Sequence, residues 1–153
     1  MGENFNTRIQ TVTFSTAGDL TSSNIDSYSF VQAMTSNAFS VQPVSISDTY
    51  TPYQRIAGVT RSDGLIAAKT GTIVKDGPCK VRVGPGGLTA GWPTTVTASG
   101  KLCVWSTGTD ATNGHNYVEC GLAQVTAVSG AIVDHWLNIQ VIGSGAAVAI
   151  SSL

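Results

Sequence analysis

The sequence predicts an all-β protein, built as a small β-barrel or β-sandwich of short antiparallel strands. Apolar residues alternate with polar ones along several short segments, the chain contains 19 threonines and 16 serines, and turn-forming residues recur at short intervals. Alternation with a period of two places one face of a strand in the core and the other in solvent. Thr and Val favour the same state, because branched side chains fit a pleated surface.

The alternation marks the expected strands in chain order. They are centred on Val12 and Phe14, Phe39 and Val41, Cys79 to Val83, Val96, and Ala131 to Ile142. In the last and longest segment, Val133, His135 and Leu137 share one face, and Asp134 and Trp136 share the other. This pattern predicts that His135 is hydrogen-bonded in the core or at an interface.

Turn signals separate these segments. Asp63-Gly64, Asp76-Gly77 and Asn113-Gly114 are dipeptides that supply the positive φ angles of tight hairpins. Short strands spaced by such turns are typical of a sandwich or a barrel.

One segment has helical spacing. Ile25, Tyr28, Val31 and Met34 recur every three residues, and residues 23–24 are of the types that cap helices. The segment is also rich in serine, so the sequence leaves open whether it forms one short helix.

The composition divides the chain into two parts. Residues 1–50 are polar and poor in glycine turns, which predicts an irregular N-terminal extension or arm; residues 51–153 carry the strand-and-turn rhythm of a β-barrel or β-sandwich domain. Within the second part, Ala57-Gly58-Val59 leads to Gly64-Leu65-Ile66 much as Cys120-Gly121-Leu122 leads to Gly130-Ala131-Ile132. The two spacings differ by three residues, so a duplicated unit stays open.

Charge and apolar content exclude several classes of protein. Eight Lys and Arg against nine Asp and Glu leave no basic surplus, so we expect no nucleic-acid partner. No run of 18 apolar residues is present, so we expect no membrane span. Three widely spaced cysteines predict reduced thiols and synthesis in a cytoplasm.

No group of residues is arranged for chemistry. A structural zinc site needs closely spaced ligands such as CxxC or HxxxH, and neither pattern occurs. There is no GxSxG elbow for a nucleophile, and the acids are scattered singly rather than paired. The sequence therefore predicts no catalytic residue, no metal and no cofactor, and a protein that is not an enzyme; a small enzyme or metal-dependent protein is the third of three functional hypotheses.

Two tryptophans lie where polar residues are expected. Trp92 is in the turn Ala90-Gly91-Trp92-Pro93, and Trp136 is on the polar face of the last long strand. Each is either a lid over the edge of the core or an anchor for another subunit. Only 11% of residues are charged, which favours a protein whose faces are covered by copies of itself or by a larger assembly.

The order of short motifs over residues 53–141 resembles that of the bacteriophage capsid cement (head decoration) proteins. The motifs are Ala57-Gly58-Val59, Gly64-Leu65-Ile66-Ala67, Gly87-Leu88-Thr89-Ala90-Gly91, Thr94 to Leu102 with its Ser99-Gly100-Lys101 hairpin, Cys120-Gly121-Leu122-Ala123 and Ser129-Gly130-Ala131-Ile132. Trp92 departs from the family pattern, which more often has an acid or a small polar residue there. The N-terminal part is also longer than in many members.

The resemblance implies a virion structural protein, made in the host bacterial cytoplasm, that binds the outside of the capsid shell and stabilises it without catalysis. It implies a homotrimer whose partner is the major capsid protein. In the family, N-terminal extensions reach across capsomers, which makes Phe5, Arg8 and Ile9 expected contacts with the shell, alongside Trp92 and Trp136.

A second hypothesis is a phage fibre, spike or host-surface adhesion module. Strands rich in Ser, Thr and Gly also suit phage fibres, and the loop tip at residues 113–116 would then bind a glycan or a cell surface.

Overall fold

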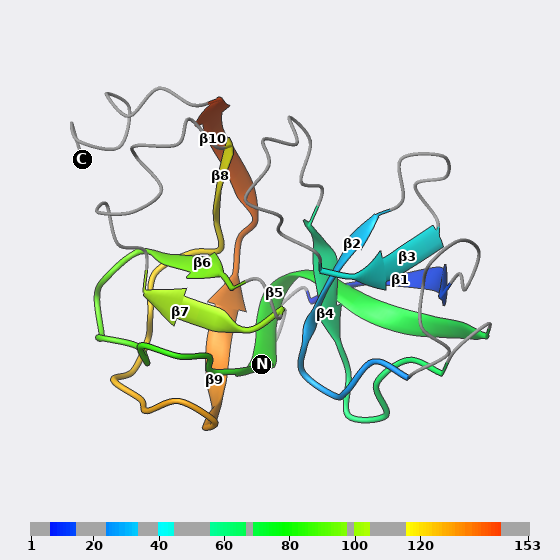
Figure 1. The fold of residues 1–153 in the computed structure, drawn as a ribbon, viewed down its shortest axis with the longest axis horizontal. Coiled ribbons are helices and arrows are strands. Elements are labelled where there is room, and N and C mark those ends of the chain that lie inside the picture. Colours follow the sequence, from blue (N-terminus) through cyan, green and yellow to red (C-terminus); the bar gives the residue numbers. More distant parts are fainter. Residues whose placement is uncertain are drawn as a thin grey trace, which may run out of the picture.

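The computed structural model describes residues 7–14, 24–33, 40–44, 56–66, 69–97, 100–104 and 116–144. These residues form an all-β fold without a helix, made of short and mostly antiparallel strands, so the predicted fold class is confirmed (Figure 1). The strands are β1 (Arg8–Phe14), β2 (Phe30–Ala33), β3 (Ser40–Pro43), β4 (Ile56–Thr60), β5 (Thr70–Arg82), β6 (Thr94–Val96), β7 (Leu102–Val104), β8 (Asn116–Glu119), β9 (Ile132–Leu137) and β10 (Gln140–Ser144).

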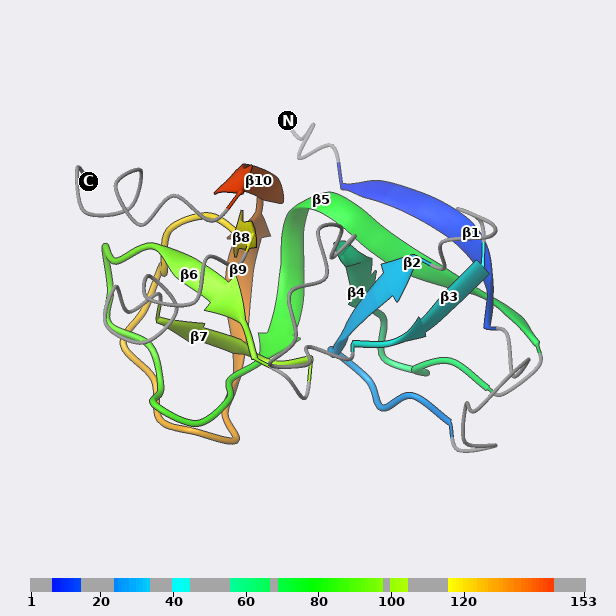
Figure 2. The same ribbon diagram turned by 45° about the horizontal axis from the view of Figure 1, so that its top comes forward.

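The molecule has two lobes joined by the long strand β5 (Figures 1 and 2). Residues 70–76 of β5 pair with β1, and residues 77–82 pair with β9. We call the described residues up to 76 the first lobe and those from 77 onward the second lobe.

The first lobe is a two-layered unit of five strands. One layer is the ribbon of β1 and β5, and the other consists of β3, β2 and β4 (Figure 2). The layers are joined by only two residue pairs between β1 and β3 and two between β4 and β5. Because these links are so short, the unit is a small β-sandwich rather than a barrel with continuous hydrogen bonding.

The second lobe repeats the strand pairings of the first. Phe30 at the start of β2 is opposite Val59 of β4, and Pro93, just before β6, is opposite Leu122. Pro93 follows Phe30 by 63 positions, and Leu122 follows Val59 by 63 positions. β2 pairs with β3 in the first lobe as β6 pairs with β7 in the second, and both pairs are antiparallel.

Isolated bridges recur in the same way. An antiparallel bridge joins Ile25 to Leu65 in the first lobe, and another joins Leu88 to Ala127 in the second. In each bridge the two residues exchange both backbone hydrogen bonds, at 2.8–2.9 Å in the first lobe and 2.8 and 3.1 Å in the second.

A parallel pairing also recurs, which is the most distinctive sign of repetition in a mainly antiparallel fold. Phe14 of β1 pairs in parallel with Val41 of β3, and Val83, directly after β5, pairs in parallel with Leu102 of β7. The fold is therefore an internal duplication, in which the end of β5 serves the second lobe as β1 serves the first.

Two glycines, Gly58 and Gly121, occupy the same position in the two lobes. A Cβ on Gly58 would overlap the carbonyl oxygen of Val74, and one on Gly121 would lie 2.7 Å from the carbonyl oxygen of Trp136. Gly121 follows Gly58 by 63 positions and Trp136 follows Val74 by 62. The absence of a side chain lets two backbones approach closely at the same place in each lobe.

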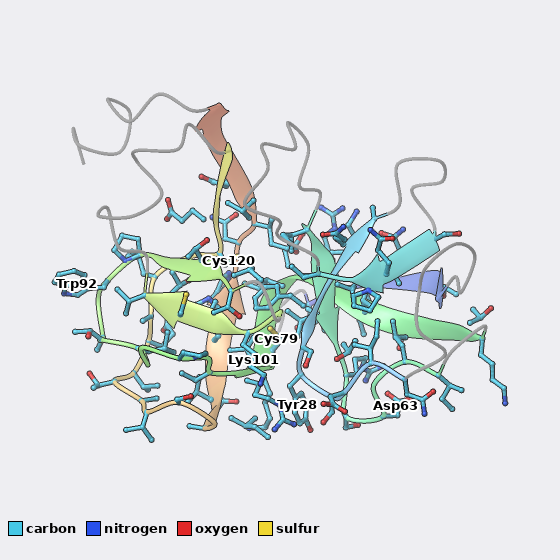
Figure 3. The ribbon with its side chains drawn as sticks, in the orientation of Figure 1. Tyr28, Asp63, Cys79, Trp92, Lys101 and Cys120 are labelled. Atoms are coloured by element: carbon cyan, nitrogen blue, oxygen red, sulfur yellow. The ribbon has the colours of Figure 1, made fainter. Side chains whose placement is uncertain are left out.

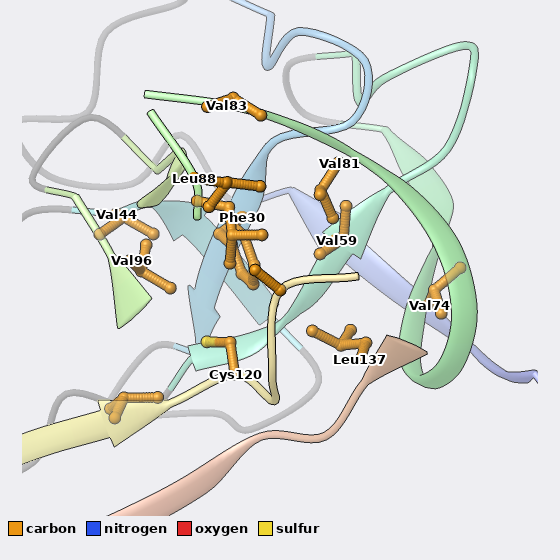
Figure 4. Close-up of a cluster of buried hydrophobic side chains, with 13 residues drawn as sticks. Phe30, Val44, Val59, Val74, Val81, Val83, Leu88, Val96, Cys120 and Leu137 are labelled. Atoms are coloured by element: carbon orange, nitrogen blue, oxygen red, sulfur yellow. The ribbon is translucent and has the colours of Figure 1, made fainter. Parts of the chain in front are cut away.

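Two hydrophobic cores hold the structure together. The smaller lies between the layers of the first lobe and consists of Ile25, Val31, Val41, Leu65 and Ile73. The larger fills the second lobe and the junction between the lobes (Figure 4), and consists of Phe30, Val44, Val59, Val74, Val81, Val83, Leu88, Val96, Leu102, Val118, Cys120, Ala123 and Leu137.

The lobes are packed against one another through the outer face of the first. Phe30, Val59 and Val74 belong to first-lobe strands, yet their side chains are buried in the larger core. Two backbone hydrogen bonds also cross the junction, from the N–H of Phe30 to the carbonyl of Gly100 (2.8 Å) and from the N–H of Arg82 to the carbonyl of Tyr28 (2.9 Å).

The structure replaces the short helix that helical spacing left open. Ile25 lies in the bridge to Leu65, and Phe30 begins β2; Met34 lies outside the described residues. Pairing with distant strands outweighs a three-residue spacing in so short a segment. The boundary expected near residue 50 also lies outside the described residues, and the strands on either side of it, β3 and β4, both pair with β2.

Candidate interaction surface

The turn that carries Trp92 is fixed by backbone hydrogen bonds. The N–H of Gly91 donates to the carbonyl of Ala123, and the N–H of Ala123 donates to the carbonyl of Trp92, both at 2.8 Å. The N–H of Trp92 itself donates to the carbonyl of Thr89 at 3.1 Å. The indole is 54% exposed at the edge of the second lobe that faces away from the first (Figure 3).

Leu122 lies on the strand segment next to this turn. Its neighbour Gly121 accepts from both the N–H (2.9 Å) and the hydroxyl (2.7 Å) of Thr94, and the N–H of Cys120 donates to the carbonyl of Thr94 (2.9 Å). Together with the bond from Ala123 to Trp92, these bonds hold the backbone on both sides of Leu122, which is 52% exposed opposite Pro93.

Trp136 reaches the same region from β9. It pairs with Pro78 of β5, and its backbone lies against that of Gly121. Strand alternation turns Leu137 into the core and leaves Trp136 facing outward, 49% exposed. We call Trp92, Pro93, Leu122 and Trp136 the second-lobe face; it is apolar and carries no charged residue.

The structure separates the expected partner-binding residues. Trp92 and Trp136 both flank the segment Gly121–Ala123 of the second lobe. Arg8 and Ile9 lie on β1 of the first lobe, both exposed, and Arg8 forms an ion pair with Asp76 at 3.4 Å. Phe5 lies outside the described residues.

Sequence reasoning missed Pro93 and Leu122 as members of this surface. The signal was the repeat of Gly58 at Gly121, which places Leu122 at the position of Val59. The repeat noted in the sequence began at Cys120 and ended at Ile132, so it included neither Trp92 nor Trp136.

A hollow of about 370 Å³ opens beside Ile9, where β1, β4 and β5 meet. Tyr28, Arg61, Cys79 and Lys80 also line it. Burial, with the negative charge of Asp134 as a second cause, raises the pKa of the Cys79 thiol to about 12, so this thiol stays protonated near neutral pH. It is therefore a poor nucleophile.

Cys120 and His135 are likewise held in their neutral forms. Burial is also the main cause that raises the pKa of Cys120, and none of the three cysteines forms a disulfide. His135 is buried, and its Nε2 lies 2.6 Å from the carbonyl oxygen of Cys120, so the neutral ring donates there. Burial lowers the pKa of His135, which keeps the ring neutral, and the expected hydrogen-bonded core histidine is confirmed.

No group of three or more His, Cys, Asp or Glu side chains among the described residues is placed to hold a metal ion. The same residues include no helix long and apolar enough to cross a membrane.

No family model matches the chain, and no curated protein matches it. Among solved structures, the fold is similar to that of the head fiber gp8.5 N base in bacteriophage phi29. The TM-score is 0.52 at 13% sequence identity, and the alignment covers 86% of this chain and 93% of that chain.

The likeness is one of fold. Because the alignment covers 86% of this chain, it extends over both lobes rather than one. At 13% identity, the resemblance shows how the strands are arranged and does not carry over any residue's role.

Proposed function

We propose that this chain is a phage virion structural protein that binds the outside of the capsid shell and stabilises it without catalysis. The observation that carries the proposal is the fold, which extends over both lobes and matches the base of a phage head fiber. The inert thiols and the neutral, buried His135 agree with a protein that makes contacts rather than breaking bonds.

The mechanism is multivalent contact between proteins. Apolar burial contributes about 25 cal/mol per Å², so one modest contact contributes little to a shell. When the same contact is repeated over many linked copies, the contributions add, and each bound copy holds its neighbours in place.

We propose the major capsid protein as the partner and a homotrimer as the binding unit. The N-terminal segment with Phe5, Arg8 and Ile9 is the part assigned to the shell. Support from the structure is that Arg8 and Ile9 are exposed on β1, at the start of the described chain, where they are accessible to another protein. In this proposal the protein is made in the bacterial cytoplasm and resides on the capsid surface.

The test is addition of the purified protein to phage heads assembled without it. We expect the protein to sediment with the heads at a fixed stoichiometry and to raise their melting temperature. An Ile9→Glu variant should bind more weakly, whereas Val128→Glu, on a different exposed loop, should bind as wild type. Heads that neither retain the protein nor gain stability would refute the proposal.

A second candidate function is the base of a head fibre that contributes to host attachment, which the similarity in fold to the base of a phage head fiber favours. It predicts binding to host cell-wall material or glycans. Retention on isolated cell walls by the protein alone would support this function, and a glycan array without hits, together with head binding, would exclude it.

A further inference from the structure

The starting observation is how the outer face of the first lobe is buried. Phe30, Val59 and Val74 are 1%, 0% and 6% exposed, although all three point away from the first lobe's own core. They are covered because the second lobe packs over them, with Leu88 and Val81 among the covering side chains (Figure 4).

The internal duplication gives each of these residues an equivalent in the second lobe. Pro93 corresponds to Phe30, Leu122 to Val59 and Trp136 to Val74. Trp92 takes the place of Ser29, since the N–H of Ala123 donates to its carbonyl as that of Thr60 donates to the carbonyl of Ser29. The second-lobe face is thus the repeat of a face that is buried in the first lobe.

The chemistry of the second-lobe face is that of a covered surface. Leu122 and Trp136 are about half exposed, and the small Ser29 is replaced by the larger and apolar Trp92. A position that served only to face water would lose little by becoming polar. Pro93 is smaller than Phe30 but still apolar, and Trp92, Leu122 and Trp136 are each larger apolar residues than their equivalents. Tryptophan is also the residue most enriched among those that dominate binding energy at protein interfaces.

We infer that the second-lobe face packs against the first lobe of a second copy of this chain, as the first-lobe face packs against the second lobe within one chain. The receiving surface comprises the C-terminal end of β1, away from Arg8 and Ile9, and the β2–β3 pair. These are the equivalents of the end of β5 and the β6–β7 pair, which cover Phe30. The contact joins two different surfaces, so it is heterologous and runs head to tail.

One difference shows what must stabilise this contact. Phe30 donates its N–H to the carbonyl of Gly100 across the junction, and its equivalent Pro93 has no N–H to donate. The contact between copies therefore lacks this hydrogen bond, and apolar side chains must supply a larger share of its stability than they do between the lobes. Because the face has no charged residue, we expect the association to persist at high salt.

We assign the face to a second copy rather than to the capsid, because within one chain the equivalent face of the first lobe is covered by the other copy of the duplicated unit. This inference names a contact within the proposed homotrimer and does not depend on capsid binding: contact between copies would persist in a protein that does not bind phage heads.

The test is the oligomeric state of the full chain, measured by native mass spectrometry and sedimentation velocity. We expect wild type to be an oligomer, and Leu122→Glu and Trp136→Glu each to weaken association at least about thirtyfold, as for a typical hot-spot residue. Both positions are exposed, so the variants should keep the wild-type circular dichroism spectrum.

Val128→Glu is the matched control. Val128 is 77% exposed, and its equivalent Ile66, 62 positions earlier, is also exposed, so neither lobe uses this position for packing. We expect this variant to assemble as wild type. A monomeric wild type, or Leu122→Glu that assembles as well as Val128→Glu, would overturn the inference.

A mixture distinguishes head-to-tail contact from a symmetric face-to-face contact. Leu122→Glu keeps an intact first lobe, so it should still receive the second-lobe face of wild type. Isotopically labelled Leu122→Glu mixed with wild type should give mixed oligomers. If the mixture contains only wild-type oligomers and free variant, both copies contribute the same face and the head-to-tail geometry is wrong.

Discussion

The two lobes share one pattern of strand pairing and differ in what they bury. Between the layers of the first lobe, Val31 and Ile73 are apolar. Their equivalents in the second lobe are Thr94, which follows Val31 by 63 positions, and His135, which follows Ile73 by 62; both are buried and hydrogen-bonded. The same pairings therefore tolerate polar side chains where a partner carbonyl is within reach.

The outer faces of the two lobes are both apolar and differ in how far they are buried. When a duplicated unit packs head to tail, the face of the first lobe is buried by the second lobe, and the equivalent face of the second lobe is left half exposed. The residues of this half-exposed face are apolar, as are those of the buried one.

The largest expected effect concerns the covered face. Phe30→Ala removes a fully buried ring from the junction and should lower the free energy of unfolding by about 3–5 kcal/mol. The equivalent change Pro93→Ala removes a half-buried side chain, and we expect a much smaller loss. Urea unfolding of both variants measures this, and equal losses would contradict the difference between the two faces.

The close backbone approach provides a second comparison. Gly121 has a φ of 96° and no room for a Cβ, whereas Gly130 has a φ of 89° and open space around it. Gly130→Ala should cost about 1–2 kcal/mol from left-handed strain alone. Gly121→Ala should cost more, because the backbone of Trp136 must also move, and thermal unfolding would show the order of the two.

The buried histidine predicts a pH dependence that the first lobe lacks. Burial lowers the pKa of His135 in the folded state, so below about pH 6.5 the unfolded chain binds a proton that the folded chain does not. Stability should be fully present above that pH and fall below it, by up to about 1.4 kcal/mol per pH unit.

The control for this prediction is His135→Ile, which installs the residue found at the equivalent position 73. The contribution of His115, which lies outside the described residues, is the same in both proteins and cancels in the difference. Equal slopes for the two proteins between pH 7.5 and pH 5.5, measured by urea unfolding, would show that His135 is not the titrating group.

The smallest expected effect is on the exposed ribbon. Lys80 and Asp134 form an ion pair at 2.9 Å on the β5–β9 pair, where the β1–β5 pair has Thr11 opposite Thr72. Replacing Lys80 and Asp134 together with threonines should leave the urea unfolding midpoint close to that of wild type, because both charged side chains are exposed. A clearly lower midpoint would mean that the lobes differ in more than their faces.

Much of the fold could be predicted from the sequence. Alternation at Cys79 to Val83 and at Val133 to Leu137 located the ribbon of β5 and β9, because each strand has one buried face. The predicted final strand, which extended to Ile142, is broken at residues 138–139, where β9 ends before β10.

The sequence left the duplication open on one short motif, Ala57-Gly58-Val59 against Cys120-Gly121-Leu122, because the lobes are equivalent in their pairings rather than in their side chains. Val31 and Thr94, or Ile73 and His135, share a position in the fold and little chemistry. Gly58 and Gly121 are identical because a close backbone approach admits no other residue there. The second-lobe face depended on that equivalence, so sequence alone identified Trp92 and Trp136 but not what joins them.

The most direct test is the native mass of the full-length wild-type chain in dilute and concentrated solution. The packing of the two lobes predicts a species heavier than one 15.8 kDa chain, which reverts to a single chain when Leu122 becomes glutamate. A wild-type protein that stays at 15.8 kDa at every concentration would show that the uncovered apolar face is not a site of contact between copies.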